Sequence, residues 1–167
     1  MKKQKPLEYG IFSVIILVGI ALDQLTKWLA VKFLAPITTQ PIIKNVLHLT
    51  YVENRGAAFG MLANHRWIFM IISTATILLL LGVLYAGYLP NMLYKVSVSM
   101  IVSGGIGNMI DRLMLGYVVD FIDFRLINFA IFNGADSFVC VGAGLLILAL
   151  IKDIIAESKT KKQDGEP

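Results

Sequence analysis

Five aspartates are the residues of this sequence best suited to chemistry, because the chain around them is otherwise apolar: Asp23, Asp111, Asp120, Asp123 and Asp136. Ionisable side chains beside hydrocarbon are costly, so they tend to be functional. Two carboxyl groups held close together cannot both ionise easily, so one keeps its proton while the other acts as a base. Such a pair could activate water and protonate a leaving amine, as in aspartic proteases. The alternative is proton or cation transport through the same buried acids.

Each acid taken alone also has a simpler explanation. Asp23 could pair with Lys27, one helical turn further along the chain. Asp136 could only cap a helix N-terminus. Asp111 could form an ion pair with Arg112 at a helix end. Together, however, the five acids are expected on one side of the molecule and near one depth. None of these separate explanations predicts that arrangement.

A stripe of polar residues on one predicted helix also lies near the depth of these acids. Gly104, Asn108 and Asp111 are spaced i, i+4 and i+7, which places them on one face of a helix. Together with Gly104, the residues Gly105 and Gly107 would let another backbone approach closely. We therefore expect a tight helix contact beside the polar stripe.

Competing chemistries lack the residues they need. Ser103 and Ser137 have no suitably placed histidine, which argues against a nucleophile activated by a base. Cys140 lies in an apolar run and is expected to be an inert packing residue. His48 and His65 share no metal-ligand spacing with a cysteine. We expect neither a metal nor a cofactor.

The elements that must position these residues follow from composition. The chain has 167 residues, of which 57% are hydrophobic and 16% charged, and its mean hydropathy is +0.74. These values argue against a soluble domain and against a disordered chain. Apolar runs of roughly 20 residues are typical of transmembrane helices. We predict an all-α integral membrane protein, one domain over residues 1–167, with four transmembrane helices at about 10–29, 67–86, 92–112 and 137–155.

Basic residues in both tails set the expected orientation. Tails 1–8 and 157–167 belong in the cytoplasm, and the last ten residues are expected to be disordered. The outer segments are then 32–66, with a strand-like stretch at Val46–Val52, and 113–136. We expect these outer segments to form a small extracytoplasmic β-like segment and a short outer helix or loop. The chain has no basic stripe with interleaved aromatic residues, so nucleic-acid binding is not expected.

Five motifs, in this order, resemble those of lipoprotein signal peptidase, the type II signal peptidase of bacteria. The resemblance covers essentially residues 10–152, and five motifs in order are highly specific where one alone is weak. The motifs are Asp23-Gln-Leu-Thr-Lys27, Asn54-Arg-Gly-Ala-Ala-Phe-Gly60, Gly104-Gly-Ile-Gly-Asn-Met-Ile-Asp-Arg112, Val118-Val-Asp-Phe121 and Phe132-Asn-Gly-Ala-Asp-Ser137.

The resemblance implies an intramembrane aspartic endopeptidase of the bacterial inner membrane. Its substrate would be a prolipoprotein whose future N-terminal cysteine carries diacylglycerol, cleaved just before that cysteine. The expected partners are such substrates, membrane lipid and globomycin-type inhibitors. Nothing in the sequence requires more than a monomer, and the active site would lie near the extracytoplasmic surface.

The resemblance also assigns residues. The catalytic dyad falls on Asp120 and Asp136. One departure from the family pattern is Gly134, where a bulky aliphatic residue is usual, and we expect it to affect local packing rather than chemistry. The supporting or substrate-binding positions that match the family are Asp23, Asn54, Arg55, Asn108, Asp111, Arg112 and Asn133.

Overall fold

Helices make up most of the computed structural model, which describes residues 5–56 and 66–163. Within these residues it contains four α-helices, a three-stranded sheet and one short 3-10 helix. The helices are α1 Pro6–Phe33, α2 Arg66–Tyr85, α3 Met92–Met114 and α4 Gly134–Gln163. The strands are β1 Thr39–Ile43, β2 Leu47–Asn54 and β3 Val118–Phe124, and the 3-10 helix η2 Arg125–Ile127 follows β3.

Local sequence explains where the helices begin and end. Pro6 opens α1 earlier than expected, at a position where its missing N–H costs nothing. Asn91 caps α3, because its side chain accepts a 3.0 Å hydrogen bond from the N–H of Leu93. The expectation of disorder from Ser158 onward is wrong as far as Gln163, where α4 ends. This stretch is rich in lysine and glutamine, which favour helix even where they are polar.

The sheet brings the last outer segment against the start of α4. It is antiparallel with the order β1-β2-β3, and the predicted strand Val46–Val52 corresponds to β2. An irregularity in β2 places Val52 opposite Asp120 of β3. Ile122 of β3 and Phe132 then exchange backbone hydrogen bonds of 2.8 and 3.1 Å. This bridge holds the chain directly before α4 beside β3.

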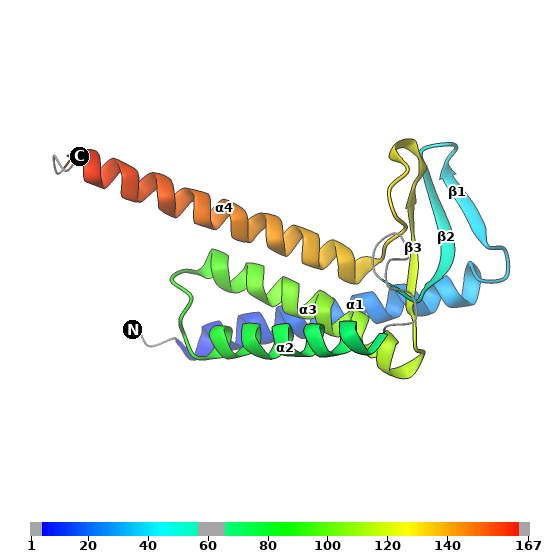
Figure 1. Ribbon diagram of the computed structural model, residues 1–167, viewed down its shortest axis with the longest axis horizontal. Helices are drawn as coiled ribbons and strands as arrows, with labels where there is room; N and C mark the ends of the chain where they lie inside the picture. The colour runs from blue at the N-terminus through cyan, green and yellow to red at the C-terminus, as the bar shows by residue number, and fades with distance from the viewer. Residues whose placement is uncertain (1–4, 57–65, 164–167) are drawn as a thin grey trace.

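Helix α3 is the centre of the helical layer and lies against each of the other three helices (Figure 1). Small residues make the contact with α4 close, as the glycine spacing predicted. A Cβ on Gly104 would collide with the carbonyl oxygen of Ala135, and one on Gly142 would lie 2.8 Å from the carbonyl oxygen of Ser97. The first of these contacts places the start of α4 directly on α3.

The outside of the helical layer is apolar. Large hydrophobic side chains such as Leu17, Trp67, Leu79 and Ile147 are more than half exposed. Such a continuous apolar surface fits lipid rather than water. Among the described residues, two helices are long and apolar enough to span a membrane: α1, and α4 over Gly134–Lys159. Only 28% and 11% of their apolar windows are buried, so neither is the core helix of a soluble domain.

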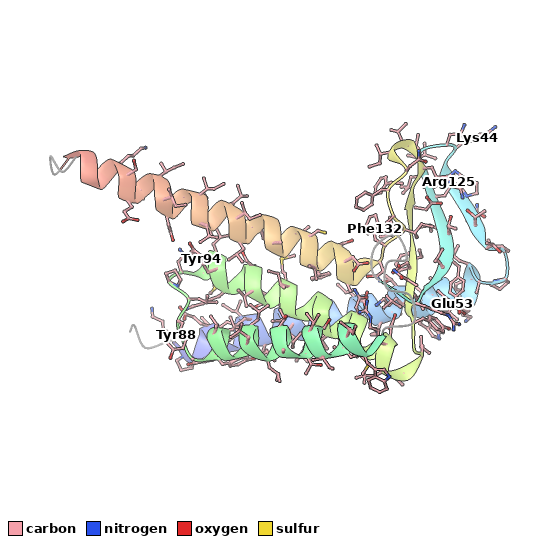
Figure 2. All side chains as sticks on the ribbon, viewed as in Figure 1. Lys44, Glu53, Tyr88, Tyr94, Arg125 and Phe132 are labelled. Carbon is pink, nitrogen blue, oxygen red and sulfur yellow. The ribbon has the colours of Figure 1, made fainter. Side chains whose placement is uncertain are left out.

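The sheet and the helix ends define two poles of the molecule. Figure 1 shows the sheet at one end of the helical layer, whereas α1 begins and α4 ends toward the other end. Figure 2 shows Lys44, Glu53 and Arg125 at the sheet pole, and Tyr88 and Tyr94 at the opposite pole. The candidate site lies where the sheet meets the helices.

Candidate active site

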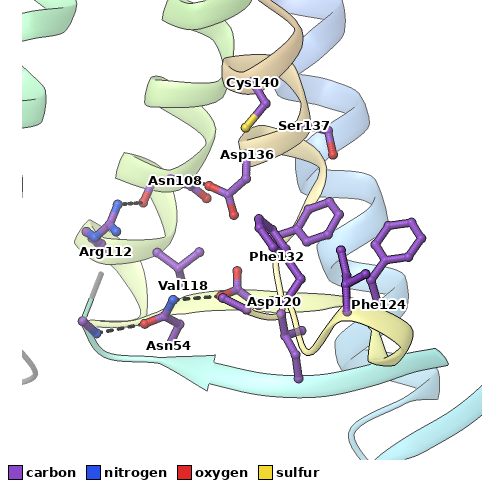
Figure 3. A pocket seen from close by; sticks show the side chains of 15 residues that line it. Asn54, Asn108, Arg112, Val118, Asp120, Phe124, Phe132, Asp136, Ser137 and Cys140 are labelled. Atoms are coloured by element: carbon purple, nitrogen blue, oxygen red, sulfur yellow. Dashed lines mark hydrogen bonds between the residues drawn. The ribbon is translucent and has the colours of Figure 1, made fainter. Parts of the chain in front are cut away.

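A cavity of about 530 Å³ opens between β3, the end of α3 and the first turns of α4 (Figure 3). Asp120 and Asp136 both line it, and they come from β3 and from α4. The structure therefore brings together the two acids assigned to the dyad. The wall of the cavity is otherwise largely apolar and includes Phe124, Phe129 and Phe132.

Asp120 is almost fully buried, with 2% of its surface exposed. Asn54 donates a 2.9 Å hydrogen bond to its Oδ2, and Asn133 donates one of 2.7 Å to its Oδ1. Burial raises the pKa of the Asp120 carboxyl to about 6, and the charge of Asp136 raises it as well, while these two hydrogen bonds oppose the rise. Asp120 therefore changes its protonation state close to neutral pH.

Asp136 lies in the first turn of α4 and is held from two sides. Asn108 of α3 donates a 2.7 Å hydrogen bond from Nδ2 to Asp136 Oδ1. The backbone N–H of Asn133 donates to Asp136 Oδ2 at 3.2 Å, and the Asp136 N–H donates to Asn133 Oδ1 at 2.9 Å. Asn133 thus caps α4 and also bonds to Asp120, so one residue joins the two carboxyl groups.

A second layer of charge lies behind the cavity. Lys27 forms ion pairs with Asp23 at 2.8 Å and with Asp111 at 3.1 Å, and the ion-paired side chains are at most 4% exposed. The simple explanation of Asp23 as a partner of Lys27 is therefore correct. Gln24 donates to Asp111 Oδ1 at 3.0 Å and closes the cluster. Asp23 also accepts the N–H of Ala135 at 2.8 Å, which ties α1 to the start of α4.

Two charged residues assigned from the sequence have other neighbours than expected. Asp111 forms an ion pair with Lys27, and the guanidinium of Arg112 lines the cavity. Arg55 is exposed, pairs with Glu53 at 2.9 Å and does not line the cavity. Arg55 directly follows β2, outside the group of residues around the dyad.

Asp123 lies apart from the other four aspartates singled out in the sequence. It accepts hydrogen bonds from Thr50 at 2.7 Å and from Arg125 at 2.8 Å, and it does not line the cavity. Burial alone would raise the pKa of Asp123, but the bonds from Arg125 and Thr50 outweigh it and lower the pKa. Asp123 therefore stabilises the sheet as a carboxylate.

Two polar residues of the second layer, Lys27 and Gln24, are absent from the residues assigned by sequence. The signal for Lys27 was available, because a lysine inside an apolar helix is costly unless it is paired. The interpretation of Cys140 as a buried packing residue is wrong, since it is exposed and lines the cavity. It follows Asp136 by one helical turn, which places it on the same face of α4.

The structure has room for a Cβ atom at position 134, where this chain has a glycine. A Cβ built there would lie 3.4 Å from Asp23 Oδ1 and 3.5 Å from Thr26 Oγ1, which are ordinary contacts. The bonds of Asn133 and Asp136 described above are intact, in line with an effect on packing only.

Comparisons with known proteins agree with this site. The model of the family described as Signal peptidase (SPase) II matches residues 15–152. The chain belongs to the signal peptidase II family. It is 52% identical over 134 residues to a lipoprotein signal peptidase of Caldanaerobacter subterraneus, covering 80% of this chain and 90% of that one. It is 43% identical over 152 residues to that of Clostridioides difficile, covering 90% and 99%.

A solved structure of a bacterial membrane enzyme, determined by the in meso method at 1.9 Å resolution, has the same fold. The TM-score is 0.79 at 33% identity, and the match covers 92% of this chain and 99% of that one. Membership of the signal peptidase II family makes the chain a peptidase and an integral membrane protein. The family gives no support to the transporter alternative.

Proposed function

We propose that this chain is an aspartic endopeptidase that removes the signal peptide from diacylglyceryl-modified prolipoproteins, cleaving just before the lipidated cysteine. The observation that carries the proposal is the pair of acids, Asp120 and Asp136, in one cavity and bridged by Asn133. The matching relatives are named lipoprotein signal peptidases, which supports prolipoproteins as the substrate class.

The dyad would share one proton and hold a water molecule between its carboxyl groups. The ionised carboxylate removes a proton from this water as it attacks the scissile carbonyl carbon. The protonated carboxyl stabilises the developing oxyanion and then passes a proton to the leaving amine. The raised pKa of Asp120 supports a shared proton, because this carboxyl holds a proton at a higher pH than an ordinary aspartate does. No step requires a metal, so activity should survive a strong chelator.

The rest of the cavity supports the substrate assignment. Arg112 is a hydrogen-bond donor in the cavity wall and could orient the substrate backbone. The apolar side chains of Phe124, Ile127 and Phe129 also line the cavity, where they could contact acyl chains or the apolar signal peptide. A globomycin-type lipopeptide would compete for the same space.

We also propose a four-span topology in the bacterial inner membrane, with a monomeric enzyme. α1 and α4 meet the length and hydropathy of a span, and the described part of α2 contains a shorter apolar stretch, Met70–Tyr85. The start of α1 and the end of α4 lie toward the same pole, which supports cytoplasmic tails 1–8 and 157–167. The dyad lies at the sheet pole, which would face outward.

Paired substitutions test the function. Asp120→Asn and Asp136→Asn should each lower cleavage of a diacylated prolipoprotein in detergent by about 100-fold or more, because each removes one half of the acid–base pair. Asp123→Asn is the matched control, since it changes the same strand outside the cavity and should keep normal cleavage. Near-normal cleavage by either dyad variant would overturn the assignment.

A further inference from the structure

Lys27 is a buried charge of α1 that lies behind the dyad, with 3% of its surface exposed. Its Nζ lies 2.8 Å from Asp23 Oδ2 and 3.1 Å from Asp111 Oδ2. It also donates a 2.8 Å hydrogen bond to Asn108 Oδ1. An ammonium group has three protons to donate, and these three acceptors match that number.

The two carboxylates bound by Lys27 hold the backbone next to the dyad. Asp23 uses its second oxygen, Oδ1, to accept the N–H of Ala135 at 2.8 Å. Asp111 accepts the N–H of Val119 at 3.0 Å. Ala135 and Val119 are the residues directly before the two dyad aspartates. One ammonium therefore links the backbone supports of both catalytic carboxyl groups.

We propose that Lys27 is a positioning residue that sets the separation and orientation of the Asp120 and Asp136 carboxyl groups. It acts as the shared counter-ion of Asp23 and Asp111, which otherwise repel each other across the contact between α1 and α3. The proposal rests on the function proposed above, because it takes these two aspartates as the dyad.

The third partner of Lys27 fixes a side chain as well as the backbone. Asn108 Oδ1 accepts from the Lys27 ammonium and, at 3.0 Å, from Asn133 Nδ2. The amide group of Asn108 is therefore turned so that Nδ2 donates to Asp136 at 2.7 Å. A flipped amide would point its N–H bonds at the ammonium, which electrostatics forbids. Lys27 thus selects the amide orientation that serves Asp136.

The charge of Lys27 also reaches the dyad directly. Its positive charge lowers the pKa of Asp120, in opposition to burial and to the charge of Asp136. Loss of this charge should therefore keep Asp120 protonated to a higher pH. The charged groups around Lys27 come from four elements: Asp23 of α1, Asp111 and Arg112 of α3, Asp120 of β3 and Asp136 of α4.

The test is the pH profile of Lys27→Gln with a diacylated prolipoprotein in detergent. We expect kcat to fall while KM changes little, because substrate contacts remain. The acid limb of the kcat profile should move to higher pH by about half to one unit, since a nearby positive charge is lost. Lys27→Arg keeps the charge, so the acid limb should stay in place. Its planar donors fit three acceptors poorly, so kcat should remain low.

Lys95→Gln is the matched control. Lys95 is also a buried lysine, and its ammonium pairs with Glu8 at 2.6 Å, near the start of α1 and far along α3 from the dyad. Its loss should lower the melting temperature without moving the acid limb or kcat of the folded fraction. If Lys27→Gln does not fold, the kcat of Lys27→Arg decides, because this variant keeps the positive charge and changes only the donor geometry.

The outcomes separate this proposal from the proposed function. An unmoved acid limb in Lys27→Gln, or a rise in KM with normal kcat, would overturn the positioning role. A normal kcat of Lys27→Arg would also overturn the positioning role. Asp120→Asn is assayed in parallel: if it cleaves normally, the dyad itself is wrong. If it is inactive and the Lys27 variants behave like Lys95→Gln, only the role of Lys27 fails.

Discussion

Asn133 donates a 2.7 Å hydrogen bond from its side-chain amide to Oδ1 of Asp120, across the gap between the residue before α4 and strand β3. The same residue caps α4 through its side-chain oxygen and donates its backbone N–H to the other dyad acid. Asn133 is fully buried, with 0% exposure. A single side chain therefore couples the start of a helix to the middle of a strand.

Asn133→Ala should lower kcat by about 10- to 100-fold, because a buried hydrogen bond to a charged group is lost at the dyad. The measurement is steady-state cleavage of a diacylated prolipoprotein. Asn91→Ala is the matched control, since Asn91 caps α3 away from the cavity. It should cost about 1 kcal/mol of stability and leave kcat unchanged. Equal kcat in the two variants would show that the bridge is dispensable.

The pH dependence of cleavage should report on Asp120. Its pKa is about 6, so the ionised form needed as a base is lost as the pH falls through that value. We expect kcat/KM to fall about tenfold for each pH unit below it. Asn54→Ala removes a hydrogen bond that lowers this pKa, so its acid limb should move to higher pH. An acid limb at about 3.9, the value of an ordinary aspartate, would contradict the role of Asp120 as this base.

Much of the site could be predicted because charge is costly beside lipid. That cost singled out five acids, of which Asp23, Asp111, Asp120 and Asp136 lie together in the structure. The glycine pattern predicted a close helix contact, which the structure shows between α3 and α4. The motifs then placed the dyad on two acids that the structure brings into one cavity. The first two inferences depend on burial and helix spacing, whereas the dyad assignment depends on the resemblance of the motifs to those of a known family.

The partners of the charges could not be predicted in the same way. Residues adjacent in a helix do not face each other, and Asp111 forms its ion pair with Lys27 of another helix. Asp123 follows Asp120 by three positions in a strand, where side chains alternate between faces, so it points away from the cavity. The bridging by Asn133 depends on the pairing of β3 with the segment before α4, which no local pattern reveals.

Two neighbouring glycines of α3 should differ in their tolerance of substitution, because Gly104 faces α4 and Gly105 faces α2. Gly104→Ala places a methyl group against the Ala135 carbonyl, whose backbone cannot move away cheaply. We expect a loss of about 1–3 kcal/mol from overpacking and a fall in kcat, because α4 carries Asp136. Gly105→Ala meets only the flexible side chain of Ile77 at 3.2 Å and should be tolerated. Thermal unfolding and cleavage assays measure both effects, and equal behaviour of the two variants would contradict this packing.

Cys140 should report on occupancy of the cavity. It is the one cysteine of the chain, it is exposed, and it lines the cavity one helical turn after Asp136. A bulky maleimide attached there should block cleavage, because it fills space that the substrate needs. Cys140→Ser should cleave normally and resist the reagent, and a lipopeptide bound in the cavity should slow labelling. Labelling is followed by mass spectrometry alongside cleavage. Complete modification with full activity would show that the substrate takes another path past α4.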